Sequence, residues 1–206
     1  IASYDATVLI SGETGSGKEL AARAIHYQGK RSDKPFIPVN CGALPDHLIE
    51  NELFGHCKGA YTDAREGQHG LIAQAEGGTL FLDEVDALSP RAQVSLLRFL
   101  EDGKYRLLGG SRLESADVRI LAASNVSLQK LVDEDHFRAD LHYRLNVMEL
   151  AVPPLRVRGD DIALLAHHFI GEAALRYGMP RLELHPETLR WLASQPWPGN
   201  IRELQN

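Results

Sequence analysis

This sequence has little cysteine, no long apolar run and no excess of positive charge. With only Cys41 and Cys57 it cannot build a disulfide framework, so we expect reduced thiols and a cytoplasmic protein. No apolar run approaches the ~20 residues that span a membrane, so we expect no membrane contact. The formal net charge of −6 argues against this chain, by itself, as the main nucleic-acid binder. The histidines show no zinc-site spacing, so we expect no structural metal.

What the sequence does contain is a glycine-rich loop between an apolar stretch at residues 7–10 and a helical pattern. Strand, loop and helix in this order form the context of a phosphate-binding loop. Glycines let backbone N–H groups converge on phosphate oxygens, and a helix N-terminus adds positive potential. Lys18 brings a full positive charge to the outer phosphates. The loop therefore predicts a nucleoside triphosphate site made of Gly12, Glu13, Thr14, Gly15, Ser16, Gly17, Lys18 and Glu19.

A second motif, at residues 78–84, is an apolar stretch that ends in two adjacent carboxylates. Asp83 is placed to hold a magnesium ion, directly or through water. Glu84 is placed to polarise the attacking water. Such a pair can also be a solvated strand end, but behind a phosphate loop it predicts a hydrolytic site. Glu19 stands where the general phosphate-loop pattern has a magnesium-binding Ser or Thr.

Strand and helix patterns alternate through the first three quarters of the chain. Strand-like stretches occur at residues 8–10, 36–39, 80–82, 118–123 and 147–152. Helical patterns between them predict an α/β fold with a five-stranded parallel sheet covered on both faces. Ligands of such sheets bind at the carboxyl ends of the strands, where both motifs lie.

Two further segments depart from this alternation. Residues 104–117 surround a Gly109-Gly110 turn and predict an inserted β-hairpin. After Pro153-Pro154 only helical patterns follow. We therefore predict a nucleotide-binding core at residues 1–152 and a small helical subdomain at residues 153–206. The abrupt beginning and end make the chain look like a piece of a longer protein, with the helical subdomain truncated.

The motifs together resemble a known family. The loop with Glu19 after Lys18 is similar to its phosphate loop, and four further segments match in order, at residues 39–41, 52–56, 137–145 and 197–204. The chain resembles the AAA+ domain of bacterial enhancer-binding proteins, the ATPases that activate sigma-54 RNA polymerase. The resemblance implies an AAA+ P-loop NTPase core with a helical lid, ATP and Mg²⁺ as cofactors, and assembly into a ring, typically a hexamer. It also implies DNA binding through a domain outside this chain.

The resemblance assigns roles to two asparagines. Asn125 resembles the sensor of the terminal phosphate, because its amide can donate to a phosphate and accept from water. A buried structural asparagine is the alternative. Asn40 matches the switch asparagine that would hold Glu84 away from water, and a capping or turn asparagine is the alternative.

Three arginines also match family positions. Arg138 and Arg144 resemble arginine fingers, which would reach the nucleotide of a neighbouring subunit and make hydrolysis depend on assembly. Surface or salt-bridged arginines are the alternative. Arg202 resembles the lid's sensor, which would couple the lid to the nucleotide state.

The segment matching the family's sigma-54 contact loop departs from the pattern Gly-Ala-Phe-Thr-Gly-Ala at two positions. Tyr61 keeps an aromatic ring and adds a hydroxyl. Asp63 replaces a glycine, so left-handed backbone angles become costlier and a negative charge enters a docking surface. Asp also adopts that region better than most residues, so it can equally be tolerated. The residues of this partner-contact loop are Gly59, Ala60, Tyr61, Thr62, Asp63 and Ala64.

Two functions remain open from the sequence. In the first, the domain hydrolyses ATP, engages sigma-54 and remodels the closed promoter complex. In the second, the ATPase fold serves oligomerisation and nucleotide sensing in a regulator that no longer contacts sigma-54. A third, weaker reading is another AAA+ remodeller, such as a chelatase or an unfoldase.

Overall fold

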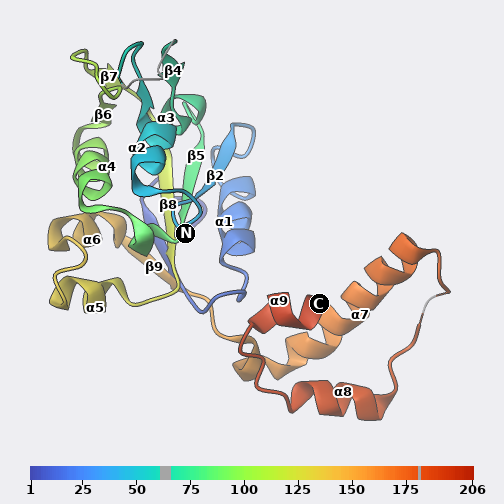
Figure 1. Cartoon of the computed structure of the whole chain (residues 1–206). Coiled ribbons are helices and arrows are strands. Elements are labelled where there is room, and N and C mark those ends of the chain that lie inside the picture. The colour runs from blue at the N-terminus through green and yellow to red at the C-terminus, as the bar shows by residue number, and fades with distance from the viewer. Residues whose placement is uncertain (61–65, 181) are drawn as a thin grey trace. The chain divides into compact units, whose positions relative to one another are not determined.

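The computed structural model describes residues 1–60, 66–180 and 182–206, apart from the side chains of Asp46 and His47. Contacts within the chain define two compact units (Figure 1). The first comprises Ile1–Ser11 and Glu19–Leu150, and the second Gly12–Lys18 and Ala151–Asn206. Compactness does not by itself define independently folding domains, so the predicted division at residues 152/153 stays a prediction.

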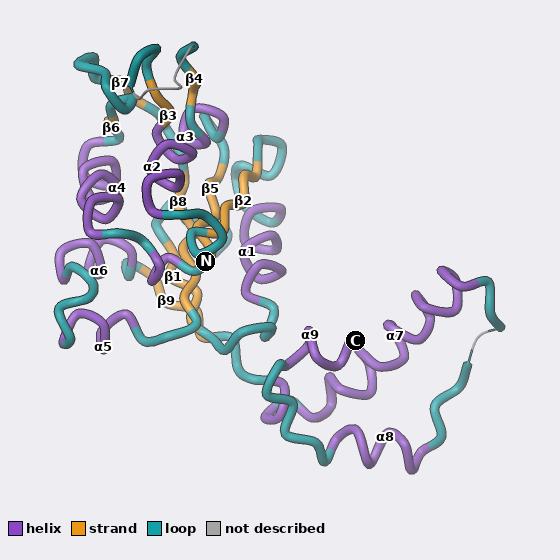
Figure 2. The backbone as a smooth tube through the Cα atoms, viewed as in Figure 1, coloured by secondary structure: helices purple, strands orange, loops and turns teal. Residues whose placement is uncertain are grey.

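A five-stranded sheet forms the centre of the first unit, drawn in orange in Figure 2. The strand order is β2-β5-β8-β1-β9, and the registers of β2 with β5, β5 with β8, and β1 with β8 are parallel. All five predicted strands are therefore confirmed. Their bounds are Val8–Ser11 (β1), Phe36–Asn40 (β2), Thr79–Asp83 (β5), Arg119–Ser124 (β8) and Met148–Ala151 (β9).

The central strands are buried on both faces, because side chains alternate between the faces and both faces carry helices. On one face, residues such as Leu80, Leu82 and Ala122 pack in one core cluster with side chains of α2, α4 and α6. On the other, Phe81 and Leu121 are also buried. Figure 1 shows α1 on this second side of the sheet. The helices are α1 (Lys18–Tyr27), α2 (Asp46–Phe54), α3 (Leu71–Gln74), α4 (Pro90–Asp102), α5 (Leu128–Asp133) and α6 (Ala139–Leu145).

Two helices bury sides that hydropathy does not indicate. Hydropathy favours Leu20, Ala21, Ala24 and Ile25 as the buried side of α1, but Leu20 is 67% exposed and Ala24 is also exposed. The buried side of α1 carries Ala22, Ile25 and His26 instead. On α4 the buried side is centred on Ala92, Leu96 and Phe99, so Val94 and Leu100 are only half-buried. Ser89 caps α4, since its hydroxyl accepts a hydrogen bond from the Ala92 N–H at 3.3 Å.

The predicted hairpin is present and lies beside a second small sheet. Strands β6 (Lys104–Tyr105) and β7 (Glu114–Ser115) pair antiparallel, as do β3 (Gly55–His56) and β4 (Gln68–His69). The Cys57 N–H donates to the Leu108 carbonyl at 2.9 Å, and the Leu108 N–H donates to the Gly55 carbonyl at 2.9 Å. These bonds join the hairpin to the segment that leads into the predicted contact loop.

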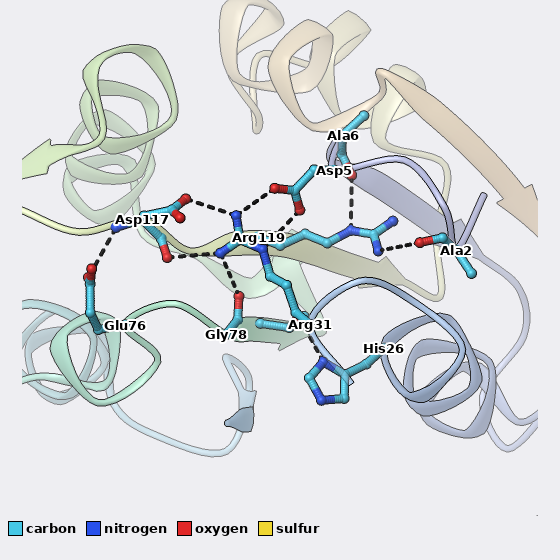
Figure 3. Close-up of polar contacts among 10 residues, drawn as sticks. Ala2, Asp5, Ala6, His26, Arg31, Glu76, Gly78, Asp117 and Arg119 are labelled. Atoms are coloured by element: carbon cyan, nitrogen blue, oxygen red, sulfur yellow. Dashed lines mark hydrogen bonds and ion pairs between the residues drawn. The ribbon is translucent and has the colours of Figure 1, made fainter. Parts of the chain in front are cut away.

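A polar network ties the start of the chain to the amino ends of the central strands (Figure 3). The Arg31 guanidinium pairs with the carboxylates of Asp5 and Asp117 and donates to the Gly78 carbonyl at 3.2 Å. This guanidinium lowers the pKa of Asp5. Arg119, which is buried, donates to the carbonyls of Ile1, Ala2 and Ala6. The network stabilises the amino ends of these strands, and the predicted catalytic residues lie at the opposite, carboxyl ends.

The residues described after Ala151 form helices and no strand, as predicted (Figure 2). A short 3-10 turn, η2 (Leu155–Val157), precedes α7 (Gly159–Tyr177), α8 (Pro186–Ala193) and α9 (Asn200–Gln205). Helix α7 contacts both α8 and α9. Gly178 ends α7 in the left-handed region at φ 64°, a conformation that favours glycine.

Candidate nucleotide site

Three adjacent strands bring the predicted polar residues together at their carboxyl ends, which form one edge of the sheet. Asn40 ends β2, Asp83 ends β5, and Asn125 directly follows β8. Asn40 and Asp83 are register partners in the parallel pair of β2 and β5. The parallel fold therefore gathers residues that lie far apart in the sequence, as the motifs predicted.

Glu84 occupies an unusual backbone position at this edge. Its φ of 53° and ψ of 47° lie in the left-handed region, and its N–H donates to the Asp83 carboxylate at 3.0 Å. A side chain at Gly42 would come within 2.4 Å of the Glu84 carboxylate. The Asp83 carboxylate thus bonds the backbone of the turn, whereas the Glu84 carboxylate lies beside Gly42.

Asn40 and Glu84 meet around the same glycine. The Asn40 side-chain oxygen accepts a hydrogen bond from the Gly42 N–H at 2.8 Å. Asn40 thus shapes the turn against which the Glu84 carboxylate lies. It is therefore a turn asparagine, and it also lies near Glu84. The switch role stays a prediction, as does the sensor role of Asn125.

This edge carries concentrated negative charge. Burial raises the pKa of the Cys41 thiol, and the carboxylates of Asp83, Asp86 and Glu84 raise it further, to about 12. A cation bound at the edge would neutralise part of this charge. Mg²⁺ often uses only one or two carboxylates together with phosphate oxygens, so Asp83 fits that role. Among the described residues, no group of three or more His, Cys, Asp or Glu side chains is arranged to hold a metal ion.

The loop at Gly12–Lys18 has the backbone that phosphate binding requires. Gly15 and Gly17 adopt φ values of 74° and 103°, which L side chains rarely adopt. A side chain at Gly15 would meet the Gly199 carbonyl oxygen at 2.3 Å. Lys18 is buried, and its ammonium group donates to the carbonyls of Gly12 at 2.8 Å and Glu13 at 3.2 Å. The loop therefore curls around the lysine ammonium, and these residues fit a bound triphosphate.

Arg202 lies beside this loop, and its sensor role stays a prediction. Helix α9 begins against Gly15, since the Ile201 N–H donates to the Gly15 carbonyl at 3.0 Å. A side chain added at Gly15 would come within 3.1 Å of the Arg202 Cβ atom. Glu19, by contrast, pairs with Arg23 on the exposed side of α1, with the closest N–O distance 2.7 Å. Its contribution to nucleotide binding stays a prediction.

The two predicted arginine fingers lie at opposite ends of α6. Arg138 precedes the helix, and its half-exposed guanidinium pairs with Asp140 through two bonds of 3.0 and 2.7 Å. This carboxylate raises the pKa of Arg138. Arg144 is exposed in the last turn. Both side chains are accessible to a neighbouring subunit, and their catalytic role stays a prediction.

Most of the predicted partner-contact loop lies outside the described residues. Tyr61, Thr62, Asp63 and Ala64 belong to that part. The two described members lie at its base, where Gly59 has φ 80° and a side chain at Gly109 would meet the Ala60 Cβ atom at 2.8 Å. The base of the loop thus packs against the turn of the predicted hairpin.

Sequence reasoning missed the residues that hold the phosphate loop. Arg156, Arg158 and Asn200 all bind it, and none of the three was among the predicted site residues. A signal was present in the left-handed preference of Asn, because Asn200 adopts φ 52° while fully buried. The two arginines carried no comparable signal.

Comparison with known protein families shows which family this chain belongs to. Residues 1–151 match the model described as "Sigma-54 interaction domain". The chain belongs to this family. Residues 156–206 of the chain match the model described as "AAA+ ATPase lid domain". The resemblance read from the motifs and the AAA+ P-loop NTPase fold are thereby confirmed.

Curated relatives of the sigma-54 interaction domain are bacterial regulators. It is 50% identical over 206 residues to the response regulator protein PilR of Pseudomonas aeruginosa, covering 100% of this chain and 46% of that protein. It is 48% identical over 206 residues to the Nif-specific regulatory protein of Azotobacter vinelandii, covering 100% of this chain and 39% of that protein. The chain therefore spans less than half the length of these relatives.

Solved structures agree with this assignment. The crystal structure of NtrX from Brucella abortus in complex with ATP superposes with a TM-score of 0.91 at 35% identity, covering 100% of this chain and 44% of that one. A closed-state reconstruction of Hsp104 has a TM-score of 0.70 at 22% identity over 97% of this chain and 38% of that one, a likeness of fold alone. No helix among the described residues combines the length and the apolarity needed to cross a membrane.

Proposed function

We propose that this sigma-54 interaction domain hydrolyses ATP and uses the cycle to remodel the sigma-54 RNA polymerase closed complex. The observation that carries the proposal is the Asp83-Glu84 pair at the carboxyl ends of the strands, where Glu84 has a left-handed backbone and its N–H bonds the Asp83 carboxylate. Family membership over residues 1–151 and the ATP complex of NtrX support the choice of nucleotide.

Each residue at the edge has a separate task in this proposal. Asp83 holds a magnesium ion, which would neutralise charge on the phosphates when bound. Glu84 accepts a proton from the attacking water, since a carboxylate within reach of that water acts as a general base. Asn40 sets the turn against which Glu84 lies, and Asn125 senses the terminal phosphate.

The loop and the lid hold the nucleotide. Backbone N–H groups of Gly12–Lys18 surround the phosphates, and Lys18 compensates their charge. Arg202, beside Gly15, contacts the nucleotide from the lid. Glu19, which directly follows Lys18, contributes to nucleotide binding.

Catalysis also needs a second subunit in this proposal. Arg138 and Arg144 insert into the site of a neighbour and stabilise charge on the transferred phosphoryl group. Assembly is therefore a ring, and a hexamer is the form we propose. DNA contacts belong to a part of the protein outside this chain.

The partner-contact loop connects the cycle to transcription. ATP binding raises the loop at residues 59–64 together with the hairpin, which is hydrogen-bonded to the segment leading into it. The raised loop engages sigma-54, and hydrolysis retracts it. The second candidate, a regulator that keeps the ATPase frame but has lost sigma-54, is favoured by Asp63 alone.

Turnover is expected to depend on protein concentration. Because Arg138 and Arg144 act across an interface, phosphate release per protomer should rise with concentration and level off once rings are complete. Phosphate release and sedimentation velocity, measured on the same dilution series, check this. Turnover per protomer that stays constant down to the monomer would contradict an intersubunit site.

A further inference from the structure

Four consecutive residues of the phosphate loop are held by the helical segment that follows residue 151. The Glu13 carboxylate, the Thr14 and Gly15 carbonyls, and the Ser16 carbonyl all accept hydrogen bonds from it. Their donors lie at two places in this segment, in or directly after η2 and at the start of α9. The loop and this segment accordingly belong to one compact unit.

Glu13 and Arg156 form the charged part of this connection. The guanidinium donates to both carboxylate oxygens, at 2.7 and 2.8 Å, in the bidentate geometry that makes such pairs strong and directional. Each side chain is a little under half exposed. The hydrogen bonds from Arg156 and, to a smaller extent, from Asn200 lower the pKa of Glu13 to about 2. Glu13 is therefore ionised throughout the neutral range.

Asn200 forms the buried part, and its amide orientation is fixed by its partners. Its oxygen accepts from the Leu155 N–H at 2.7 Å, so its NH₂ group must face the other two partners. That group donates to the Glu13 carboxylate and to the Thr14 carbonyl, both at 3.1 Å. Both N–H donors and the oxygen of the amide are hydrogen-bonded, and the residue is fully buried in a left-handed conformation. An asparagine meets all these demands together, because it supplies donors and an acceptor and tolerates that conformation.

We propose that Glu13, Arg156 and Asn200 form a clasp through which the lid segment sets the conformation of the phosphate loop and thereby the affinity for nucleotide. The clasp rests on the proposed nucleotide site, adds Arg156 and Asn200 to it as positioning residues, and gives Glu13 the same role. Because coupling between two binding equilibria is reciprocal, bound nucleotide also strengthens the clasp. Nucleotide occupancy is thus transmitted to the lid through the carboxylate of Glu13 as well as through Arg202.

Arg156→Met tests the clasp on the intact chain. Methionine keeps much of the apolar stem and removes the guanidinium, and the half-exposed site leaves little reason for misfolding. We expect ADP, measured by calorimetry, to bind about tenfold more weakly, and Glu13→Gln to have a similar effect. In the double variant the two losses should not add, because both remove the same interaction. Asn200→Asp should weaken binding further, since it turns a carboxylate oxygen toward Glu13.

The controls separate the clasp from general stability and from the proposed function. Arg190→Met removes an arginine of the same unit that is 76% exposed, and it should bind ADP like the parent. A lower melting temperature with unchanged ADP affinity in Arg156→Met would overturn the clasp while leaving the nucleotide site intact. Additive losses in the double variant would also overturn it. Failure of the parent chain to bind ADP would instead refute the proposed function.

Discussion

Glu84→Gln is expected to lower ATP turnover by about 10²–10⁴-fold while leaving nucleotide affinity unchanged. The amide has nearly the shape of the carboxylate but cannot accept a proton from the attacking water. Glutamine also keeps the left-handed turn at φ 53° little changed, because the side chain differs in a single atom. The measurement is steady-state phosphate release together with calorimetric binding of ADP.

The control for Glu84 is another carboxylate of the same unit. Glu101 is exposed near the end of α4, and Glu101→Gln removes the same charge without touching the edge. It should turn over ATP like the parent. Equal turnover in Glu84→Gln and in the parent would remove Glu84 from the mechanism.

Arg138→Ala is expected to lower turnover by about 10³–10⁵-fold, the range that arginine fingers contribute in related chemistry. The loss should be complementable, because the arginine and the carboxylate of one site come from different subunits. Mixing inactive Arg138→Ala with inactive Glu84→Gln should restore part of the turnover, at sites that combine an intact Glu84 with an intact neighbouring Arg138. Phosphate release across mixing ratios measures this recovery.

Asp140→Asn separates the guanidinium from its ion pair. The Asp140 carboxylate accepts hydrogen bonds from Nε and Nη2 of Arg138, so Arg138→Ala also removes that contact. The asparagine variant weakens the same pair and keeps the guanidinium, so its turnover should stay close to that of the parent. If Asp140→Asn loses as much as Arg138→Ala, the arginine acts within its own subunit as a structural residue. Absence of recovery in the mixture would lead to the same conclusion.

The sheet and its polar edge could be predicted because each signal is local. Each strand of the five-stranded sheet contains a short apolar stretch, and Asp83 and Glu84 lie directly at the end of one. The buried side of α1 could not be predicted in the same way. Hydropathy treats Leu20 as core and His26 as surface, yet His26 is 1% exposed and bonds the Thr79 hydroxyl at 2.9 Å. A polar side chain can occupy the core when its partner lies on a distant strand.

The clasp shows the same limit at the site. Glu13 and Arg156 are separated by 143 positions, and neither residue is unusual in its own segment. The glycines and Lys18 predicted the phosphate loop from its own sequence, whereas the residues that hold the loop became visible only once the chain had folded. Local motifs thus indicate the chemistry of this site, and the distant supports that position it require the structure.

Binding of purified sigma-54 to this chain tests the central claim most directly. The chain would be loaded with a transition-state mimic of ATP and compared with the Asp63→Gly variant and with nucleotide-free samples of both. Our account predicts that the native loop binds sigma-54 only with the mimic present, and that Asp63→Gly changes the affinity little. Binding that appears only after Asp63→Gly would contradict it and identify a regulator that keeps the ATPase frame without contacting sigma-54.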